Sequence, residues 1–113
     1  MSGIIELLLE ATRKSHYPDK PSRYQSAFAC DSVESAFAIK RAIGEPSNSI
    51  YTLHPKGRVH RGDMNIYFMR GSFASIDHRL HLYWQGETLK APDHVPAWEY
   101  LLELPVLVGE KVA

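Results

Sequence analysis

The stretch WEYLLELPVLV, residues 98–108, predicts a long apolar strand, or a pair of strands interrupted by Pro105. Proline cannot donate to the hydrogen-bond ladder of a sheet, so the interruption falls at that residue. Glu99 stands between two large aromatic residues at the head of the strand. Burial beside an aromatic ring would raise the pKa of its carboxyl group or require a hydrogen-bond partner, a setting that is typical of functional carboxylates. The alternative is a glutamate at the strand edge that points to water.

The segments before this strand alternate between helix and strand patterns. The predicted helices cover residues 2–14, 31–43 and 72–85, and the predicted strands cover 23–30, 50–53 and 65–69, with a turn at 54–57. Asp31 and Glu34 form a capping pattern before the second helix, and Gly44 and Gly86 end the second and third helices. This order of elements predicts an α+β domain with a mixed or antiparallel sheet and about three helices.

Length and composition restrict the class of protein. The chain has 113 residues, 44% of them hydrophobic and 23% charged, which suits one domain over residues 1–113. The formal net charge of zero disfavours nucleic acid as a partner. Cys30 is the single cysteine, so no internal disulfide can form and a reducing, cytoplasmic location is expected. No apolar run is long enough to span a bilayer, and no membrane association is predicted.

Motifs for several common chemistries are absent from the sequence. It contains no GxGxxG or GxxxxGKS phosphate loop, no CxxC or HExxH metal motif and no GxSxG elbow. His78 and His81 lie three residues apart on a predicted helix, and His60 or His94 would have to complete a zinc site of three or four ligands. We therefore expect a solvated helix face at these histidines and no bound metal.

Two cationic regions allow a functional and a structural interpretation. The segment 54–61 is either a solvated turn or a patch for phosphate, where arginine offers bidentate hydrogen bonds. Arg23 and Ser26 would lie on opposite faces of a regular strand, so they meet one ligand only if the strand start twists or bulges. The alternative for Arg23 is a surface position on an edge strand.

Four short motifs, in their order along residues 15–110, resemble a small bacterial and phage family. That family looks like a compact branch of the ADP-ribosyltransferase superfamily. The resemblance implies a bent sheet core over residues 20–110 behind an N-terminal helix over residues 1–16. It also implies that NAD is bound in the cleft as a substrate. The motifs are Pro21-Ser22-Arg23-x-x-Ser26-x-Phe28-Ala29, Ile50-Tyr51 with His60-Arg61-Gly62-Asp63-Met64-Asn65, Tyr83-Trp84-x-Gly86, and Glu99-Tyr100-Leu101.

The same resemblance implies roles for individual residues. Glu99 would be the catalytic carboxylate, and Arg23 would bind the pyrophosphate or the adenosine-side ribose. These two side chains should line one hollow, at its opposite ends. Tyr83 and Trp84 would form an aromatic wall for nicotinamide or adenine. The full set implied to bind NAD is Arg23, Ser26, His60, Arg61, Asp63, Tyr83 and Trp84.

Departures from the family pattern leave the activity and the acceptor open. Ala97 stands where enzymes that modify arginine carry a second acidic residue, which disfavours arginine as the acceptor. The alternatives are an NAD glycohydrolase and a non-catalytic binding module on the same fold, such as a phage or mobile-element protein that acts on a host partner. An RNA- or nucleotide-binding domain that uses Tyr24, Trp84 and residues 54–61 is a third, which the neutral charge disfavours.

Overall fold

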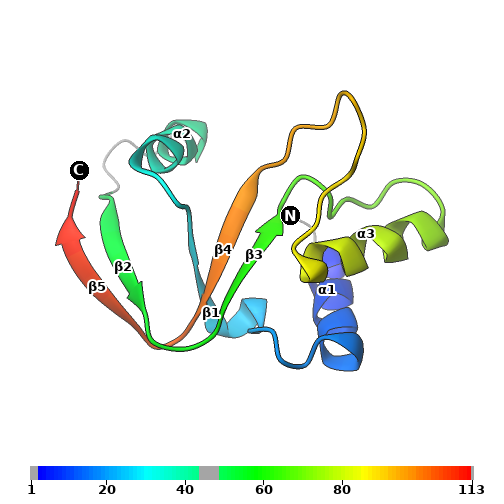
Figure 1. The fold of residues 1–113 in the computed structure, drawn as a ribbon, viewed down its shortest axis with the longest axis horizontal. Coiled ribbons are helices and arrows are strands. Elements are labelled where there is room, and N and C mark those ends of the chain that lie inside the picture. The colour runs from blue at the N-terminus through cyan, green and yellow to red at the C-terminus, as the bar shows by residue number, and fades with distance from the viewer. Residues whose placement is uncertain (1–2, 44–48, 113) are drawn as a thin grey trace.

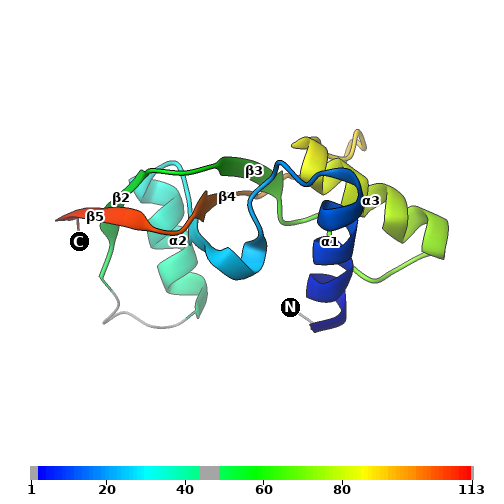
Figure 2. The ribbon, with the colours of Figure 1, turned by 90° about the horizontal axis from the view of Figure 1, so that it is seen from below.

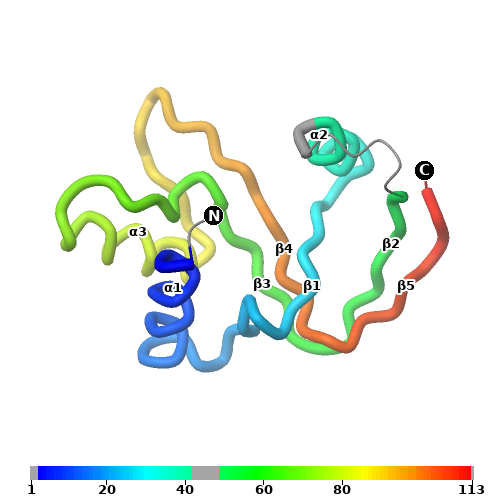
Figure 3. Tube along the Cα trace, turned by 180° about the vertical axis from the view of Figure 1, so that it is seen from behind, coloured from blue at the N-terminus to red at the C-terminus, as the bar shows by residue number. Residues whose placement is uncertain are grey.

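Two long antiparallel segments form the sheets of the protein. The computed structural model describes residues 3–43 and 49–112. The first segment, residues 51–63, carries β2 and β3, and the second, residues 98–111, carries β4 and β5. β3 pairs with β4 and β2 pairs with β5, so the two segments form a two-stranded ribbon that is bent between the two pairs (Figure 1). β1 joins the other edge of β4, which gives a three-stranded sheet of order β1-β4-β3 (Figure 3). The strands are β1 (Ser26–Ala29), β2 (Tyr51–Pro55), β3 (Val59–Asp63), β4 (Trp98–Glu103) and β5 (Val106–Lys111).

The helices lie on different parts of the bent ribbon. α1 (Gly3–His16) and α3 (Phe73–Gln85) lie beside each other at the β3–β4 arm, while α2 (Val33–Ile43) lies near the open end of the bend (Figures 1 and 2). This arrangement confirms the predicted α+β class with three helices and antiparallel strands in the described part of the chain. Within that part, no helix combines the length and the apolar character needed to cross a membrane.

The core lies between α1, α3 and the inner face of the three-stranded sheet. Helical spacing places Ile5 and Leu9 on one side of α1, and the Trp84 indole N–H donates to the Leu9 carbonyl at 2.9 Å. The indole therefore fixes α3 against α1 while its ring fills the core. The members of the core are Ile5, Leu9, Ile66, Leu80, Tyr83, Trp84 and Leu101.

An arginine–glutamate pair lies at the bend of the ribbon. Arg58 Nε donates to Glu103 Oε2 at 2.9 Å, and the Glu103 N–H donates to the Arg58 carbonyl at 3.0 Å. The Leu104 N–H donates to the Gln25 carbonyl at 2.9 Å, which ties the bend to the segment before β1. The turn in the first segment thus falls at residues 56–58, and the predicted turn at 54–57 is wrong because His54 and Pro55 belong to β2.

Three further predictions about elements need correction. The predicted strand 23–30 begins instead with a 3-10 helix, Arg23–Gln25, because the Ser22 hydroxyl accepts from the Tyr24 N–H. No strand covers residues 65–69 in the described structure. Helix α2 is capped by Ser32, whose Oγ accepts from the Ser35 N–H at 3.0 Å, and not by Asp31.

The ends of α3 follow their local sequence signals. Ser72 accepts from the Ser75 N–H, and Gly86 adopts a left-handed conformation with φ of 75° after the last turn, as expected for glycine at this position. Both limits of this helix are therefore confirmed. The predicted end of α2 at Gly44 lies outside the described residues.

Candidate active site

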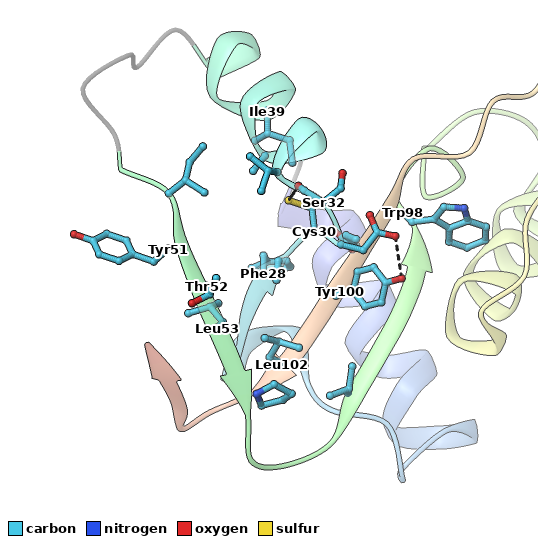
Figure 4. A pocket seen from close by; sticks show the side chains of 18 of the residues that line it. Phe28, Cys30, Ser32, Ile39, Tyr51, Thr52, Leu53, Trp98, Tyr100 and Leu102 are labelled. Carbon is cyan, nitrogen blue, oxygen red and sulfur yellow. Dashed lines mark hydrogen bonds between the residues drawn. The ribbon is translucent and has the colours of Figure 1, made fainter. Parts of the chain in front are cut away.

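A cleft of about 920 Å³ opens between α2, the β2–β5 arm and the three-stranded sheet. Figure 4 shows that its walls are mostly apolar and aromatic side chains. Arg23, Tyr67 and Glu99 also belong to its lining. The aromatic and aliphatic walls come from strands of both sheets and include Phe28, Tyr51, Leu53, Trp98, Tyr100 and Leu102.

Glu99 and Arg23 meet at the border of this cleft. Alternation along β4 turns Glu99 and Leu101 toward the helices, opposite to Trp98 and Tyr100. The 3-10 turn carries Arg23 to the same place, where its Nη1 donates to Glu99 Oε2. The two side chains are 5% and 8% exposed. The expectation that they line one cleft is therefore met, but they form an ion pair and do not lie at opposite ends of it.

Glu6 of α1 holds the other side of the Arg23 guanidinium. Nη2 and Nε of Arg23 donate to Glu6 Oε1 at 2.8 and 3.0 Å. The guanidinium also lies 4.9 Å from the ring centre of Phe28 and 5.0 Å from that of Tyr67. Burial alone would lower the pKa of Arg23, but the hydrogen bond with Glu6 and the charge of Glu99 raise it above its ordinary value. Arg23 is thus a permanent cation between two carboxylates.

Two tyrosine hydroxyls complete the surroundings of Glu99. Tyr83 donates to Oε2 at 2.5 Å and Tyr67 donates to Oε1 at 3.3 Å. Burial and the charge of Glu99 raise the pKa of both hydroxyl groups, so both stay protonated donors. Oε2 therefore accepts from Arg23 and Tyr83, whereas Oε1 accepts one long hydrogen bond. Oε1 keeps the capacity to accept a hydrogen bond from a ligand hydroxyl.

Ser26 supports the turn that carries Arg23. Its Oγ donates to the Ser22 carbonyl at 2.6 Å, and Ser26 is not part of the cleft lining. The Ser22 hydroxyl in turn donates to Glu10 Oε2 at 2.6 Å. The structure thus gives Ser26 a place behind Arg23, where it positions the turn and does not face a ligand.

His60 and Trp84, expected to bind NAD, lie in the core. His60 is 3% exposed, and its Nε2–H donates to the Tyr83 carbonyl at 2.9 Å. Burial, together with the positive charges of Lys20 and Arg23, lowers the pKa of His60 to about 4. Trp84 is fully buried, and Tyr83 offers its hydroxyl to Glu99 and no ring face to the cleft. The prediction that Tyr83 and Trp84 form an aromatic wall for the ligand is therefore wrong, because both side chains pack in the core.

Arg61 and Asp63, at alternate positions of β3, have separate surroundings. The Arg61 guanidinium is exposed and lies 3.9 Å from the centre of the Trp98 ring, which lines the cleft. Asp63 is fully buried and accepts hydrogen bonds from the side chains of Thr88 and His94 and from two backbone N–H groups. Arg61 thus remains near the rim of the cleft, whereas Asp63 fastens the loop before β4 and faces no ligand.

The histidines considered for a metal site make other contacts. His81 Nδ1 and the Tyr17 hydroxyl lie 2.8 Å apart, and the His81 ring lies 4.8 Å from that of His16. Over residues 3–43 and 49–112, no three histidine, cysteine or acidic side chains converge as metal ligands do.

Sequence reasoning missed Glu6 and Tyr67 as members of the site. Glu6 interrupts an apolar run, and Glu10 follows at the spacing that puts both on one helix face. That pair is the signal that could have shown an acidic face of α1 directed at the turn with Ser22 and Arg23. Tyr67 lies in a loop after β3, where no periodic pattern gives its orientation.

The chain belongs to the family described as "Protein of unknown function (DUF2441)", whose model matches residues 1–113. No curated protein shows significant sequence similarity to the chain. The functional argument accordingly depends on the cleft and on the side chains at its border.

Proposed function

We propose that the chain is an NAD-using enzyme of the ADP-ribosyltransferase type, which transfers ADP-ribose from NAD to an acceptor nucleophile, with Glu99 as the catalytic residue. The observation that carries the proposal is the buried pair of Arg23 and Glu99 at the wall of a single cleft. A volume of about 920 Å³ lies in the upper part of the range for ligand pockets, roughly 300–1,000 Å³.

The charges at this border suit the cleavage of a nicotinamide–ribose bond. Glu6 and Glu99 face one guanidinium, which leaves one negative charge in excess when both carboxylates are ionised. Breaking the bond builds positive charge on the ribose, as in other glycosidic cleavages. A fixed carboxylate in a poorly solvated place stabilises that charge more strongly than it would in water.

The reaction then follows in one balanced step. The bond between ribose C1′ and the nicotinamide nitrogen breaks, and its electron pair leaves with nicotinamide. A lone pair of the acceptor forms the new bond to C1′, and the acceptor proton passes to solvent. Glu99 Oε1 accepts the 2′-hydroxyl hydrogen bond of the ribose, in place of the long bond from Tyr67. Water as the acceptor would make the protein an NAD glycohydrolase.

The ion pair changes the role proposed for Arg23. Because Nη1 donates to Glu99, Arg23 acts at the same end of the ligand and orients the carboxylate, and it does not bind the distant pyrophosphate. Trp98 and Tyr100 line the cleft, and these rings replace Tyr83 and Trp84 as the surface for nicotinamide or adenine.

The test compares two glutamates of the same strand by nicotinamide release from NAD. Glu99→Gln removes the negative charge at the cleft, while Glu103→Gln is the matched control because Glu103 is also paired with an arginine, Arg58, outside the cleft. We expect Glu99→Gln to lower the rate roughly 100-fold or more and Glu103→Gln to keep the wild-type rate. Equal rates in the Glu99→Gln variant and the wild type would remove Glu99 from the mechanism.

One observation favours a non-catalytic binding module as the second candidate. Oε2 of Glu99 already accepts hydrogen bonds from Arg23 and Tyr83, which offset much of the charge that catalysis would need. Calorimetric titration with NAD separates the candidates. Binding with nicotinamide release supports the enzyme, and binding without any release supports the module.

A further inference from the structure

Arg23 presents different edges of its guanidinium group to two carboxylates. Nε and Nη2 donate to Glu6 Oε1 at 3.0 and 2.8 Å, and Nε also lies 3.1 Å from Glu6 Oε2. Nη1 donates to Glu99 Oε2 and, at 2.7 Å, to the Tyr83 hydroxyl. The edge formed by Nε and Nη2, which has the geometry for bidentate binding of a carboxylate, is therefore occupied by Glu6.

This division of the donors determines which oxygen of Glu99 stays available. An arginine that pairs with one carboxylate alone commonly places two nitrogens on it, and both oxygens of that carboxylate are then engaged. Here Nη1 of Arg23 reaches Oε2 of Glu99. Among the described residues, Oε1 accepts a hydrogen bond only from Tyr67, at 3.3 Å. Because Glu99 and Tyr67 both line the cleft, Oε1 is the oxygen at which a ligand can compete.

Glu6 lies on a part of α1 that the core holds in place. Ile5 and Leu9 of the same helix are 2% and 0% exposed, and the Leu9 carbonyl accepts from the Trp84 indole. The Glu6 side chain is 21% exposed and does not belong to the cleft lining. Glu6 therefore touches no ligand in the cleft and can act on the site only through Arg23.

We propose that Glu6 is a positioning residue, which holds the Arg23 guanidinium by Nε and Nη2 and so keeps Glu99 Oε1 available for the ligand. Without an acceptor at position 6, the guanidinium turns about its Nη1 contact and places a second nitrogen on Oε1. The use of Oε1 by the ribose rests on the proposed function, whereas the arrangement of the three side chains is a property of the protein without ligand.

Crystal structures of three variants without ligand test the arrangement. Glu6→Ala removes both acceptor oxygens, and a second nitrogen of Arg23 should then lie within hydrogen-bond distance of Glu99 Oε1. Glu6→Gln keeps one oxygen that can accept from both nitrogens, as Oε1 of Glu6 does, and should restore the wild-type position. Glu10→Ala, one turn further along α1 and paired with Arg13, is the matched control and should leave Arg23 in place. An unmoved Arg23 in Glu6→Ala would overturn the proposal.

Nicotinamide release from NAD measures the consequence for the proposed reaction. Glu6→Ala and Glu6→Gln lose the same negative charge, so a difference between them reports the position of Arg23. We expect kcat of Glu6→Ala to be about tenfold or more below that of Glu6→Gln, with KM for NAD within about threefold. Equal kcat values in the two variants would overturn the proposal. A wild type that releases no nicotinamide would contradict the proposed function instead, and the position of Arg23 in the variants would still decide the role of Glu6.

Discussion

Glu99 and Asp63 are buried carboxylates on paired strands, β4 and β3, and their hydrogen-bond partners give them different roles. Asp63 accepts from two backbone N–H groups and two side chains, so both of its oxygens are fully used. Glu99 accepts only from side chains, and its Oε1 accepts a single long bond. A ligand can therefore compete for Glu99 but not for Asp63.

Asp63→Asn tests the structural role of the saturated carboxylate. The asparagine amide group would face at least one of the four donors, and we expect the free energy of unfolding to fall by about 2–4 kcal/mol. Urea denaturation measures it. Asp93→Asn, an exposed change in the same loop, should stay within about 0.5 kcal/mol of the wild type. Equal stability of both variants would contradict the role assigned to Asp63.

The same contacts determine how the contribution of Asp63 to the free energy of unfolding changes with pH. Burial alone would raise the pKa of Asp63, but the hydrogen bonds from Thr88, His94, Ala97 and Asn65 outweigh it and lower the pKa below the usual value. The contribution of Asp63 to stability is therefore complete above the ordinary pKa of an aspartate and is lost as the pH falls through its lowered pKa.

His60 predicts a loss of stability at mildly acidic pH. Its pKa falls from 6.5 to about 4 in the folded protein, so the unfolded chain binds a proton first as the pH falls. We expect the wild type to lose about 2 kcal/mol of unfolding free energy through this group between about pH 7 and about pH 5. His60→Gln should lack this part of the loss, whereas His54→Gln, on the exposed strand β2, should retain it. A His60→Gln profile parallel to that of the wild type would contradict a buried neutral His60.

At the scale of elements, local signals predicted α3 and failed for the start of β1. Ser72 and Gly86 are cap residues whose effect needs only a few neighbouring residues. The strand pattern over 23–30 is just as regular, but the Ser22 hydroxyl accepts from the Tyr24 N–H and closes a 3-10 turn. Side-chain hydrogen bonds of this kind compete with sheet formation, and the bonds from Arg23 to Glu6 and Glu99 favour the turn.

The close approach of β3 to α3 makes Gly62 a sensitive position. A Cβ at Gly62 would overlap the Tyr83 ring, whose hydroxyl donates to Glu99. Gly62→Ala should lower the free energy of unfolding by about 3 kcal/mol and displace a hydrogen-bond donor of the Glu99 carboxylate. Gly3→Ala, where a Cβ meets no atom within 4 Å, is the matched control and should change stability by less than about 1 kcal/mol. Thermal denaturation of both variants checks this, and a Gly62→Ala variant as stable as the control would contradict the packing.

At the scale of the whole molecule, the three-stranded sheet borders both the core and the cleft. The core residues come from α1, the loop after β3, α3 and β4. Among the described residues of α2, β2 and β5, none belongs to this core. Instead, α2 and β2 contribute apolar side chains to one wall of the cleft, and the other wall comes from β1, β3 and β4 (Figure 4). The three-stranded sheet thus packs on the core through Leu101 of β4 and borders the cleft through Trp98 and Tyr100 of the same strand.

The order of the elements along the sequence allowed the α+β class to be predicted. Arg23 and Glu99 were expected at opposite ends of one hollow, and the structure instead joins them in an ion pair at its border. The direct ion pair and the participation of Glu6 depend on how α1 packs against the 3-10 turn, which no local pattern expresses. His60 and Trp84 were assigned to the ligand because polar and aromatic residues in a motif suggest binding. Their burial follows from alternation in β3 and from the packing of α3 on α1.

A crystal structure of the protein with bound NAD tests the central proposal most directly. The dinucleotide should occupy the cleft beside Trp98 and Tyr100, with the ribose of its nicotinamide end in hydrogen-bond contact with Glu99 and near Arg23. A cleft without NAD at saturating concentration, or NAD bound with that ribose remote from Glu99, would contradict it.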